Sequence, residues 1–272
     1  MSQSTDKAII LARGLGTRMR KSDDAASVDA RQAAIAETGV KALIPIDRPF
    51  LDYVMHALAE AGYRRICLVI GPEHSQIRDY YNSLSLKRIA ISYAIQEKPL
   101  GTANAVAAAE SFSSGDDFLM VNSDNYYPPE ACAGLRQTPG NAVALFERDA
   151  LIAGSNIPAD RIVKFAAALI SPDGYLTRIL EKPDEATLRS LGPKIFVSLN
   201  CWKFSRAIFD ACRAIKPSPR GEYEITDAVQ YCIDSLDQRF KALTYNSAVL
   251  DMSSRQDIAP VAKRLAGTKV EL

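Results

Sequence analysis

The chain has 272 residues, which is enough for one large domain or two small ones, and its 47% hydrophobic and 24% charged content is that of an ordinary globular protein. The net charge of +1 argues against nucleic acid or an anionic membrane as a partner, so any anion site must be local. Five scattered cysteines, a polar first segment and the lack of a long apolar run argue against a disulfide framework, a signal peptide and a membrane span, and we expect a cytoplasmic protein.

The first half of the chain alternates short apolar strands with amphipathic helices. We predict strands at 7–12, 64–71, 89–95 and 117–123, and helices at 49–62, 72–84 and 102–112. Pro49 suits the first helical position of its helix, and Gly62 suits the end. Because the strands are apolar on both faces, the pattern predicts a mainly parallel sheet that is covered by helices on both sides.

The second half is richer in strands. We predict strands at 141–147, 161–170, 174–182, 194–204 and 240–246, and helices at 205–215, 223–236 and 254–266. No linker, repeat or low-complexity block interrupts the chain. We therefore predict a single α/β domain over residues 1–272, with a three-layer α/β/α, Rossmann-like architecture and a mixed, mainly parallel central sheet.

Polar loops follow several predicted strands, at the edge of the sheet where such proteins bind ligands. They are RGLGTRMR (13–20), QEKPLGTA (96–103), VNSDNYYP (121–128) and EKPD (181–184). The first is no P-loop, because GxxxxGK[ST] is absent, and Met19 stands where a dinucleotide fingerprint needs its third glycine. Gly14 and Gly16 could let backbone N–H groups approach an anion, although glycines are also common at tight strand exits.

Carboxylates follow two of the apolar runs. Asp124 comes after the predicted strand 117–123 and would be a hard oxygen ligand for Mg²⁺, and Asp251 follows the run AVL. A turn or cap aspartate is the alternative at both positions. The histidines, His56 and His74, have no ligand partners at useful spacing, and no Ser/His/Asp, Cys/His or HExxH arrangement occurs.

Taken in order, these segments resemble the sugar-1-phosphate nucleotidylyltransferases, and the glucose-1-phosphate thymidylyl- and uridylyltransferase type in particular. The resemblance rests on LARGLGTRM, GVKALIPIDRPF, QEKPLGTANAV, VNSDN, EKP, GEYEITDAV and LDMSS, and covers residues 7 to 266. It implies a nucleotidyltransferase fold with a nucleotide-binding part at about 7–125, a sugar-phosphate-binding part at about 126–252 and a C-terminal helix at 254–266.

The resemblance also implies a reaction. The phosphate oxygen of a sugar 1-phosphate would attack the α-phosphorus of a nucleoside triphosphate in line, and pyrophosphate would leave, with Mg²⁺ as cofactor. UTP or dTTP is the preferred donor, because a glutamine amide at Gln96 can both donate to and accept from uracil or thymine. The alternatives are cytidylyl or guanylyl transfer to another phosphorylated acceptor, and a non-catalytic nucleotide-sugar sensor. A homo-oligomer is compatible with the sequence.

The resemblance assigns roles to individual residues. Arg18, Lys41 and Asp124 match the catalytic residues, and Asp124 and Asp251 match the metal ligands. The nucleotide-binding set is Leu11, Ala12, Gly14, Gly16, Thr17, Arg18, Gln96, Gly101 and Thr102. The sugar-phosphate-binding set is Glu181, Lys182, Asn200, Trp202 and Glu222.

The chain departs from the family pattern at several places, and three of them concern the shape or the lining of the predicted site. The segment 21–39 is an insertion, either a solvated loop with a short helix capped by Ser22 or Ser27, or a lid over the triphosphate. Trp202 takes a position that is commonly glycine, where the indole could stack on a sugar or pack in the core. Arg13 replaces the usual Ala or Gly and could lie near the base or point to solvent.

Overall fold

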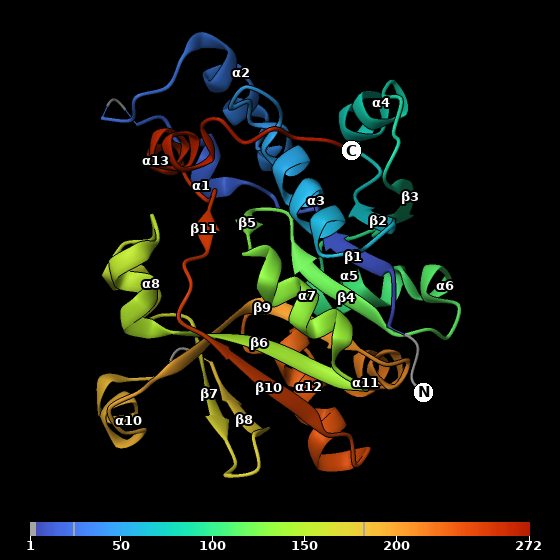
Figure 1. Ribbon diagram of the computed structural model, residues 1–272, viewed down its shortest axis with the longest axis vertical. Coiled ribbons are helices and arrows are strands. Elements are labelled where there is room, and N and C mark those ends of the chain that lie inside the picture. Colours follow the sequence, from blue (N-terminus) through green and yellow to red (C-terminus); the bar gives the residue numbers. More distant parts are fainter. Residues whose placement is uncertain (1–3, 24, 182) are drawn as a thin grey trace.

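A nine-stranded mixed sheet forms the centre of the computed structural model, which describes residues 4–23, 25–181 and 183–272 (Figure 1). The strand order is β3-β2-β1-β4-β9-β6-β10-β8-β7. The strands are β1 (Lys7–Leu11), β2 (Arg65–Ile70), β3 (Ala90–Ile95), β4 (Phe118–Asn122), β6 (Asn141–Glu147), β7 (Ala166–Ile170), β8 (Tyr175–Leu180), β9 (Phe196–Phe204) and β10 (Phe240–Tyr245). A separate antiparallel pair joins β5 (Asn125–Tyr126) to β11 (Leu250–Asp251).

The parallel half of the sheet confirms the prediction from the apolar runs. Strand β1 lies between β2 and β4, and all of these neighbours run parallel, as do β2 and β3. Ala8, Ile9 and Ile10 are fully buried, because helices cover both faces of β1. Strand β9 is antiparallel to β4 and β6, and so joins the first half to the strand-rich second half.

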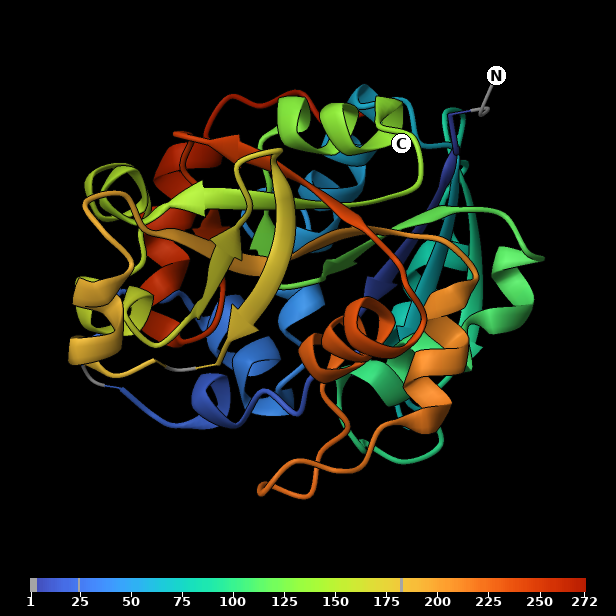
Figure 2. The same ribbon diagram turned by 90° about the horizontal axis from the view of Figure 1, so that it is seen from below.

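Helices pack on both faces of the sheet, which gives the predicted three layers. Neighbouring β1 side chains enter opposite cores, Ile9 with α11 and α12, and Ile10 with α3 and α7. Figure 2 shows α7 and the pair α11 and α12 on opposite sides of β6 and β10. The helical elements are α1 (Thr17–Arg20), α2 (Ala30–Thr38), η1 (Lys41–Leu43), α3 (Phe50–Glu60), α4 (Ser75–Asn82), α5 (Thr102–Ala108), α6 (Glu110–Ser113), α7 (Pro129–Gln137), α8 (Arg148–Gly154), α9 (Ala159–Ile162), α10 (Glu185–Ser190), α11 (Ala207–Ala214), α12 (Ile225–Ser235) and α13 (Arg255–Leu265).

Some predicted elements are wrong in extent. The expected strand 161–170 begins only at Ala166, because 159–162 form α9. The expected helix 102–112 is divided at Ala109, which separates α5 from α6. Pro49 precedes α3 as its N-cap and is not its first helical residue.

The insertion 21–39 contains the helix α2, but the predicted caps are wrong. Asp29 caps this helix, since its Oδ1 accepts a 2.7 Å hydrogen bond from the Gln32 backbone N–H, while the Gln32 side chain accepts from the Asp29 N–H at 3.1 Å. This reciprocal pair is a capping box. Gly39 ends the helix with φ 77°.

Two further features of the chain bear on its class. All five cysteines are buried and free of disulfides. Among the helices of the described residues, none combines the length and the apolar character that a membrane crossing requires.

Candidate active site

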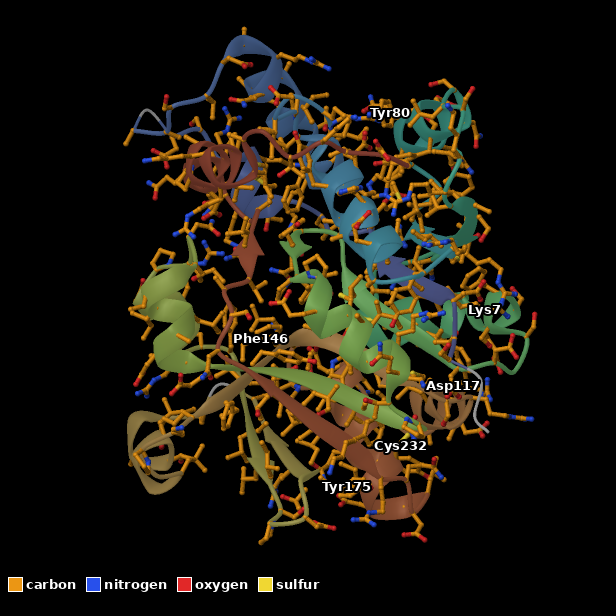
Figure 3. All side chains as sticks on the ribbon, in the orientation of Figure 1. Lys7, Tyr80, Asp117, Phe146, Tyr175 and Cys232 are labelled. Carbon is orange, nitrogen blue, oxygen red and sulfur yellow. The ribbon has the colours of Figure 1, made fainter. Side chains whose placement is uncertain are left out.

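Two adjoining cavities open at the carboxyl ends of β1, β3 and β4. The first has a volume of about 510 Å³ and the second about 220 Å³. They share four lining residues, Arg18, Asn122, Asp124 and Ser253. Figure 3 labels Lys7 and Asp117 at the opposite edge of the sheet, where β1 and β4 begin. The cavities therefore occupy the edge at which open α/β sheets bind ligands.

The first cavity brings together most of the residues assigned to the nucleotide and to catalysis. Ala12 is an exception, because it is buried in the core behind the loop and does not line the cavity. Glu222 was assigned to the sugar phosphate, but it lines this first cavity and not the second. The assigned residues on this wall are Leu11, Gly14, Gly16, Thr17, Arg18, Lys41, Gln96, Gly101, Thr102 and Asp124.

The glycine loop holds its shape through a close backbone contact. Gly16 has φ 60°, and a Cβ on it would lie 2.1 Å from the carbonyl oxygen of Gly39. Gly14 is different, since a Cβ there would meet only the Lys41 side chain, at 3.7 Å. The end of the insertion thus packs directly under the loop at Gly16. Of the described residues in 21–23 and 25–39, none lines either cavity, so the lining does not support the lid hypothesis.

We expect Gly16→Ala to lower the free energy of unfolding by about 2–3 kcal/mol, because it adds both a strained φ and an overlap with backbone atoms. Gly14→Ala is the matched control, since its added methyl group makes an ordinary contact, and it should cost less than about 1 kcal/mol. Urea unfolding of the two variants measures both values. Equal losses in the two variants would show that the Gly16–Gly39 contact does not hold the loop.

Cations and carboxylates meet where the two cavities join. Lys41 Nζ contacts Asp124 Oδ2, and both side chains are largely buried. The Arg18 guanidinium donates to Ser253 Oγ at 3.4 Å. Helix α1, β11 and α13 lie side by side here (Figure 1), and the Arg255 guanidinium ties α13 to α1 through the Met19 carbonyl at 3.1 Å. The sequence resemblance assigns Arg18, Lys41 and Asp124 to catalysis, and the fold places all three in the wall of the first cavity.

Asp251 lies in a buried network behind the junction. Its Oδ1 accepts hydrogen bonds from Asn125 Nδ2 at 3.1 Å and Ser253 Oγ at 2.8 Å, and its Oδ2 contacts the Arg161 guanidinium. Arg161 also donates to both oxygens of Asp257, at 3.2 and 3.3 Å. Burial is the main cause that raises the pKa of Asp251 to about 6, and the charge of the Asp124 carboxylate is the second cause.

The donor set of the junction fits a hard divalent cation held partly by substrate. Asp124 and Asp251 both line the second cavity, and the Asp124 carboxylate is close enough to raise the pKa of Asp251. In the described ranges, no group of three or more His, Cys, Asp or Glu side chains has the arrangement of a metal site. Mg²⁺ commonly takes one or two carboxylates and completes its octahedron with water and phosphate oxygens, so two aspartates suffice.

Arg13 lies between the glycine loop and the end of β3. Its Nε and Nη2 donate to the two carboxylate oxygens of Glu73 at 3.2 and 3.3 Å, and its Nη1 contacts the Gln96 carbonyl. The expectation that Arg13 points to solvent is wrong, because these contacts hold the side chain against the wall of the first cavity.

The second cavity carries part of the predicted sugar-phosphate set. Glu181 lines it and accepts a 2.8 Å hydrogen bond from Thr226 Oγ1. Asn200 lines it from a bulge in β9, where its φ of 61° is one that asparagine tolerates better than most residues. Lys182 lies outside the described residues.

Trp202 does not belong to the sugar pocket. Its indole is fully buried, stacks on Phe204 at 5.8 Å and meets the edge of Phe240 at 6.0 Å. Its Nε1 donates to Asn200 Oδ1 at 3.3 Å. The alternative of core packing is therefore correct, and the assignment of Trp202 to sugar contact is wrong.

Sequence reasoning missed two cations of the second cavity, Arg161 and Lys164. Both lie in the segment 161–170, which was predicted to be a strand. The available signal was Pro158 followed by Ala-Asp-Arg, a sequence that suits the first turn of a helix better than a buried strand.

An α/β sheet with two adjoining cavities, lined by cations and carboxylates at its strand ends, is the arrangement of a protein that binds polar small molecules. More narrowly, the chain belongs to the nucleotidyl transferase family, whose model matches residues 29–263.

Several known proteins are similar to this chain. It is 32% identical to the low-salt glycan biosynthesis nucleotidyltransferase of Haloferax volcanii, over 84% of this chain and 59% of that protein. It is 33% identical to the glucose-1-phosphate thymidylyltransferase of Streptomyces griseus, over 84% of this chain and 58% of that protein. The chain thus spans less than two thirds of the length of these two relatives.

A solved structure supports the fold. A UDP-glucose pyrophosphorylase in complex with UDP-glucose superposes with a TM-score of 0.75 at 18% identity, over 99% of this chain and 100% of that one. At this identity the likeness concerns the fold alone.

Proposed function

We propose that the protein transfers a nucleotidyl group from a nucleoside triphosphate to a sugar 1-phosphate and releases pyrophosphate. The observation that carries the proposal is the junction of the two cavities, where Arg18, Lys41 and Asp124 meet. The larger cavity suits the triphosphate, and the smaller one suits the sugar phosphate. A similar activity is named for the Streptomyces griseus relative.

In this reaction the protein mainly positions two anions and offsets their charge. The triphosphate lies along the glycine loop, with its α-phosphorus at the junction. A sugar-phosphate oxygen forms the new bond to that phosphorus as the bond to pyrophosphate breaks on the opposite side. Lys41 exchanges its contact with Asp124 for phosphate oxygens, and Arg18 stabilises the leaving pyrophosphate. A Mg²⁺ held by Asp124 and Asp251 would offset phosphate charge.

The donor is UTP or dTTP, because Gln96 lines the first cavity and its side-chain amide is held by the Gly101 carbonyl and Asn104 Oδ1. Cytidylyl or guanylyl transfer is the second candidate, and a nucleotide-sugar sensor is the third. A sensor has no need of Lys41 and Asp124 at the point where the two ligands meet. The cytoplasmic location and the oligomeric state stay predictions.

Pyrophosphate release tests the proposal directly. UTP, dTTP, CTP, ATP and GTP are each paired with glucose, galactose, mannose and N-acetylglucosamine 1-phosphates in the presence of Mg²⁺. We expect release with UTP or dTTP and one of these sugars, and none with the Lys41→Met variant, which controls for contaminating enzymes. Tight nucleotide-sugar binding without release for any pair would favour the sensor.

A further inference from the structure

We propose that Asn104 is a specificity-determining residue that makes the base site select a ring N–H, by fixing the orientation of the Gln96 amide. Asn104 lies on α5, half-buried, and the lining of the first cavity includes its neighbour Ala105 but not Asn104 itself. Its effect on the base is therefore indirect, through Gln96. The inference rests on the proposed function only for the identity of the ligand.

Both N–H donors of the Gln96 side chain form hydrogen bonds within the protein. Its Nε2 donates to the Gly101 carbonyl at 3.0 Å and to Asn104 Oδ1 at 2.9 Å. An amide nitrogen carries two hydrogens, so neither is left for a ligand. The side chain can offer a base only its oxygen, Oε1, so the expectation that this amide both donates to and accepts from the base is wrong as to donation.

The oxygen Oε1 faces the cavity. No protein donor contacts it among the described residues, and Gln96 as a whole is only 4% exposed. A buried Oε1 without a hydrogen-bond partner would be an unsatisfied polar atom, and within the described ranges Arg136 Nε is the single such side-chain atom. The Gln96 Oε1 atom must therefore be reached by solvent. Because Gln96 lines the first cavity, the exposed surface of Oε1 opens there.

Hydrogen bonds also fix the backbone of Gln96. Its backbone N–H donates to the Ile70 carbonyl at 2.9 Å, and Arg13 contacts its backbone carbonyl. Glu73 in turn fixes the Arg13 guanidinium with both carboxylate oxygens. This explains what Arg13 does at its unusual position: it braces the base-reading residue.

The Gly101 carbonyl, which accepts a hydrogen bond from Gln96 Nε2, is also fixed in its orientation. The Leu100 carbonyl accepts from the Tyr223 N–H at 2.8 Å, and the Ala103 N–H donates to the Tyr223 carbonyl at 2.9 Å. Gly101 has φ 111°, and a Cβ there would lie 2.5 Å from the Tyr223 carbonyl oxygen. The Gly101 carbonyl therefore cannot turn away to accommodate a rotated amide.

An exposed acceptor distinguishes pyrimidines by the proton at N3. Uracil and thymine carry an N–H at N3, which can donate to Oε1, whereas N3 of cytosine is itself an acceptor and is repelled. A half-turn of the Gln96 amide would present an N–H that suits cytosine. That rotation would set Oε1 against the Gly101 carbonyl oxygen and, with the Asn104 amide in its present orientation, against Asn104 Oδ1, and each such contact is costly in a buried site.

The variants Asn104→Leu and Asn104→Asp test this role. Leucine removes the acceptor at similar size, so one of the two contacts that oppose rotation is lost. Aspartate keeps an acceptor opposite Nε2. We expect Asn104→Leu to lower the ratio of kcat/KM for UTP to that for CTP by about tenfold, as the loss of about one hydrogen bond implies. Asn104→Asp should keep the wild-type ratio even if it weakens both triphosphates, since its extra charge acts on both alike.

The readout separates specificity from a structural role. A change that merely loosens α5 would lower kcat/KM for both triphosphates equally and leave their ratio unaltered, and that result in Asn104→Leu would overturn the proposal. A wild-type preference for CTP would also overturn it. If Asn104→Leu does not fold, as judged by circular dichroism, Asn104→Ala replaces it with the same expectation.

Calorimetric titration with UTP and CTP repeats the comparison without turnover. If no sugar 1-phosphate supports pyrophosphate release, the proposed function fails, while the ratio of the two dissociation constants still tests Asn104. We expect that ratio to narrow about tenfold in Asn104→Leu. An unchanged ratio of dissociation constants would reject the role of Asn104 on its own.

Discussion

Asp124→Asn is expected to lower kcat by about a hundredfold or more, since the carboxylate supports charge neutralisation worth several kcal/mol at the reacting phosphate. Asp124 lies at the junction of both cavities and contacts Lys41 in the free protein. The asparagine keeps the shape and removes the charge. Because Lys41 is then free for phosphate, KM for the triphosphate should be unchanged or lower, so the loss should appear in kcat.

Steady-state kinetics at several Mg²⁺ concentrations measure this effect, and binding of Mn²⁺ followed by electron paramagnetic resonance gives a readout independent of turnover. Asp160→Asn is the matched control. Asp160 is a nearby aspartate on α9, but it is 76% exposed and pairs only loosely with Lys164, at 3.7 Å. It should leave kcat within about twofold, since exposed pairs of this kind contribute little. Turnover close to wild type in Asp124→Asn, with unchanged Mn²⁺ binding, would remove Asp124 from the metal site.

The sequence predicts the parallel half of the fold well because its signal is local. The strands β1, β2 and β4 are short apolar runs buried on both faces, each followed by a polar loop. The start of β7 could not be placed in the same way. Ile162, Val163 and Phe165 continue the apolar pattern of the strand backwards into α9, and the pattern alone does not distinguish a short buried helix from a strand.

Part of the residue set of the candidate site could be predicted from the resemblance, but the contacts among its side chains could not. Gly14, Gly16, Arg18, Lys41 and Asp124 could be assigned from the resemblance, and the folded chain brings them together in the wall of the first cavity. Without the resemblance, the residue types of the segment 13–20 indicated only a glycine loop that could bind an anion.

The contacts among the site residues depend on tertiary packing, which the spacing of residues along the sequence does not predict. The contact of Arg161 with Asp251 joins residues 90 positions apart, and that of Arg13 with Gln96 joins residues 83 apart. The side of β9 that Trp202 occupies is likewise fixed by its pairing with Met120 and Val143, whose side chains belong to the core with α11 and α12.

We expect Arg161→Met to lower the free energy of unfolding by about 3–5 kcal/mol, because it leaves two buried carboxylates without their cation. The side chains of Asp251 and Asp257 are only 7% and 5% exposed, and Arg161 contacts both. Methionine retains much of the apolar stem, so the loss should come chiefly from the charge. Urea unfolding at pH 7 measures it.

A second substitution separates charge from packing. Adding Asp251→Asn to Arg161→Met removes one of the two uncompensated charges, so the double variant should be more stable than Arg161→Met, although Asp251→Asn alone should be less stable than wild type. Lys164→Met is the matched control, since Lys164 borders the same cavity but is 66% exposed and should change stability by less than about 0.5 kcal/mol. A double variant no more stable than Arg161→Met would mean that Arg161 acts through its packing. The expected order of stabilities follows from the positions of the charges. The Arg161 guanidinium is the cation that allows this chain to bury the Asp251 and Asp257 carboxylates beside the junction of its cavities.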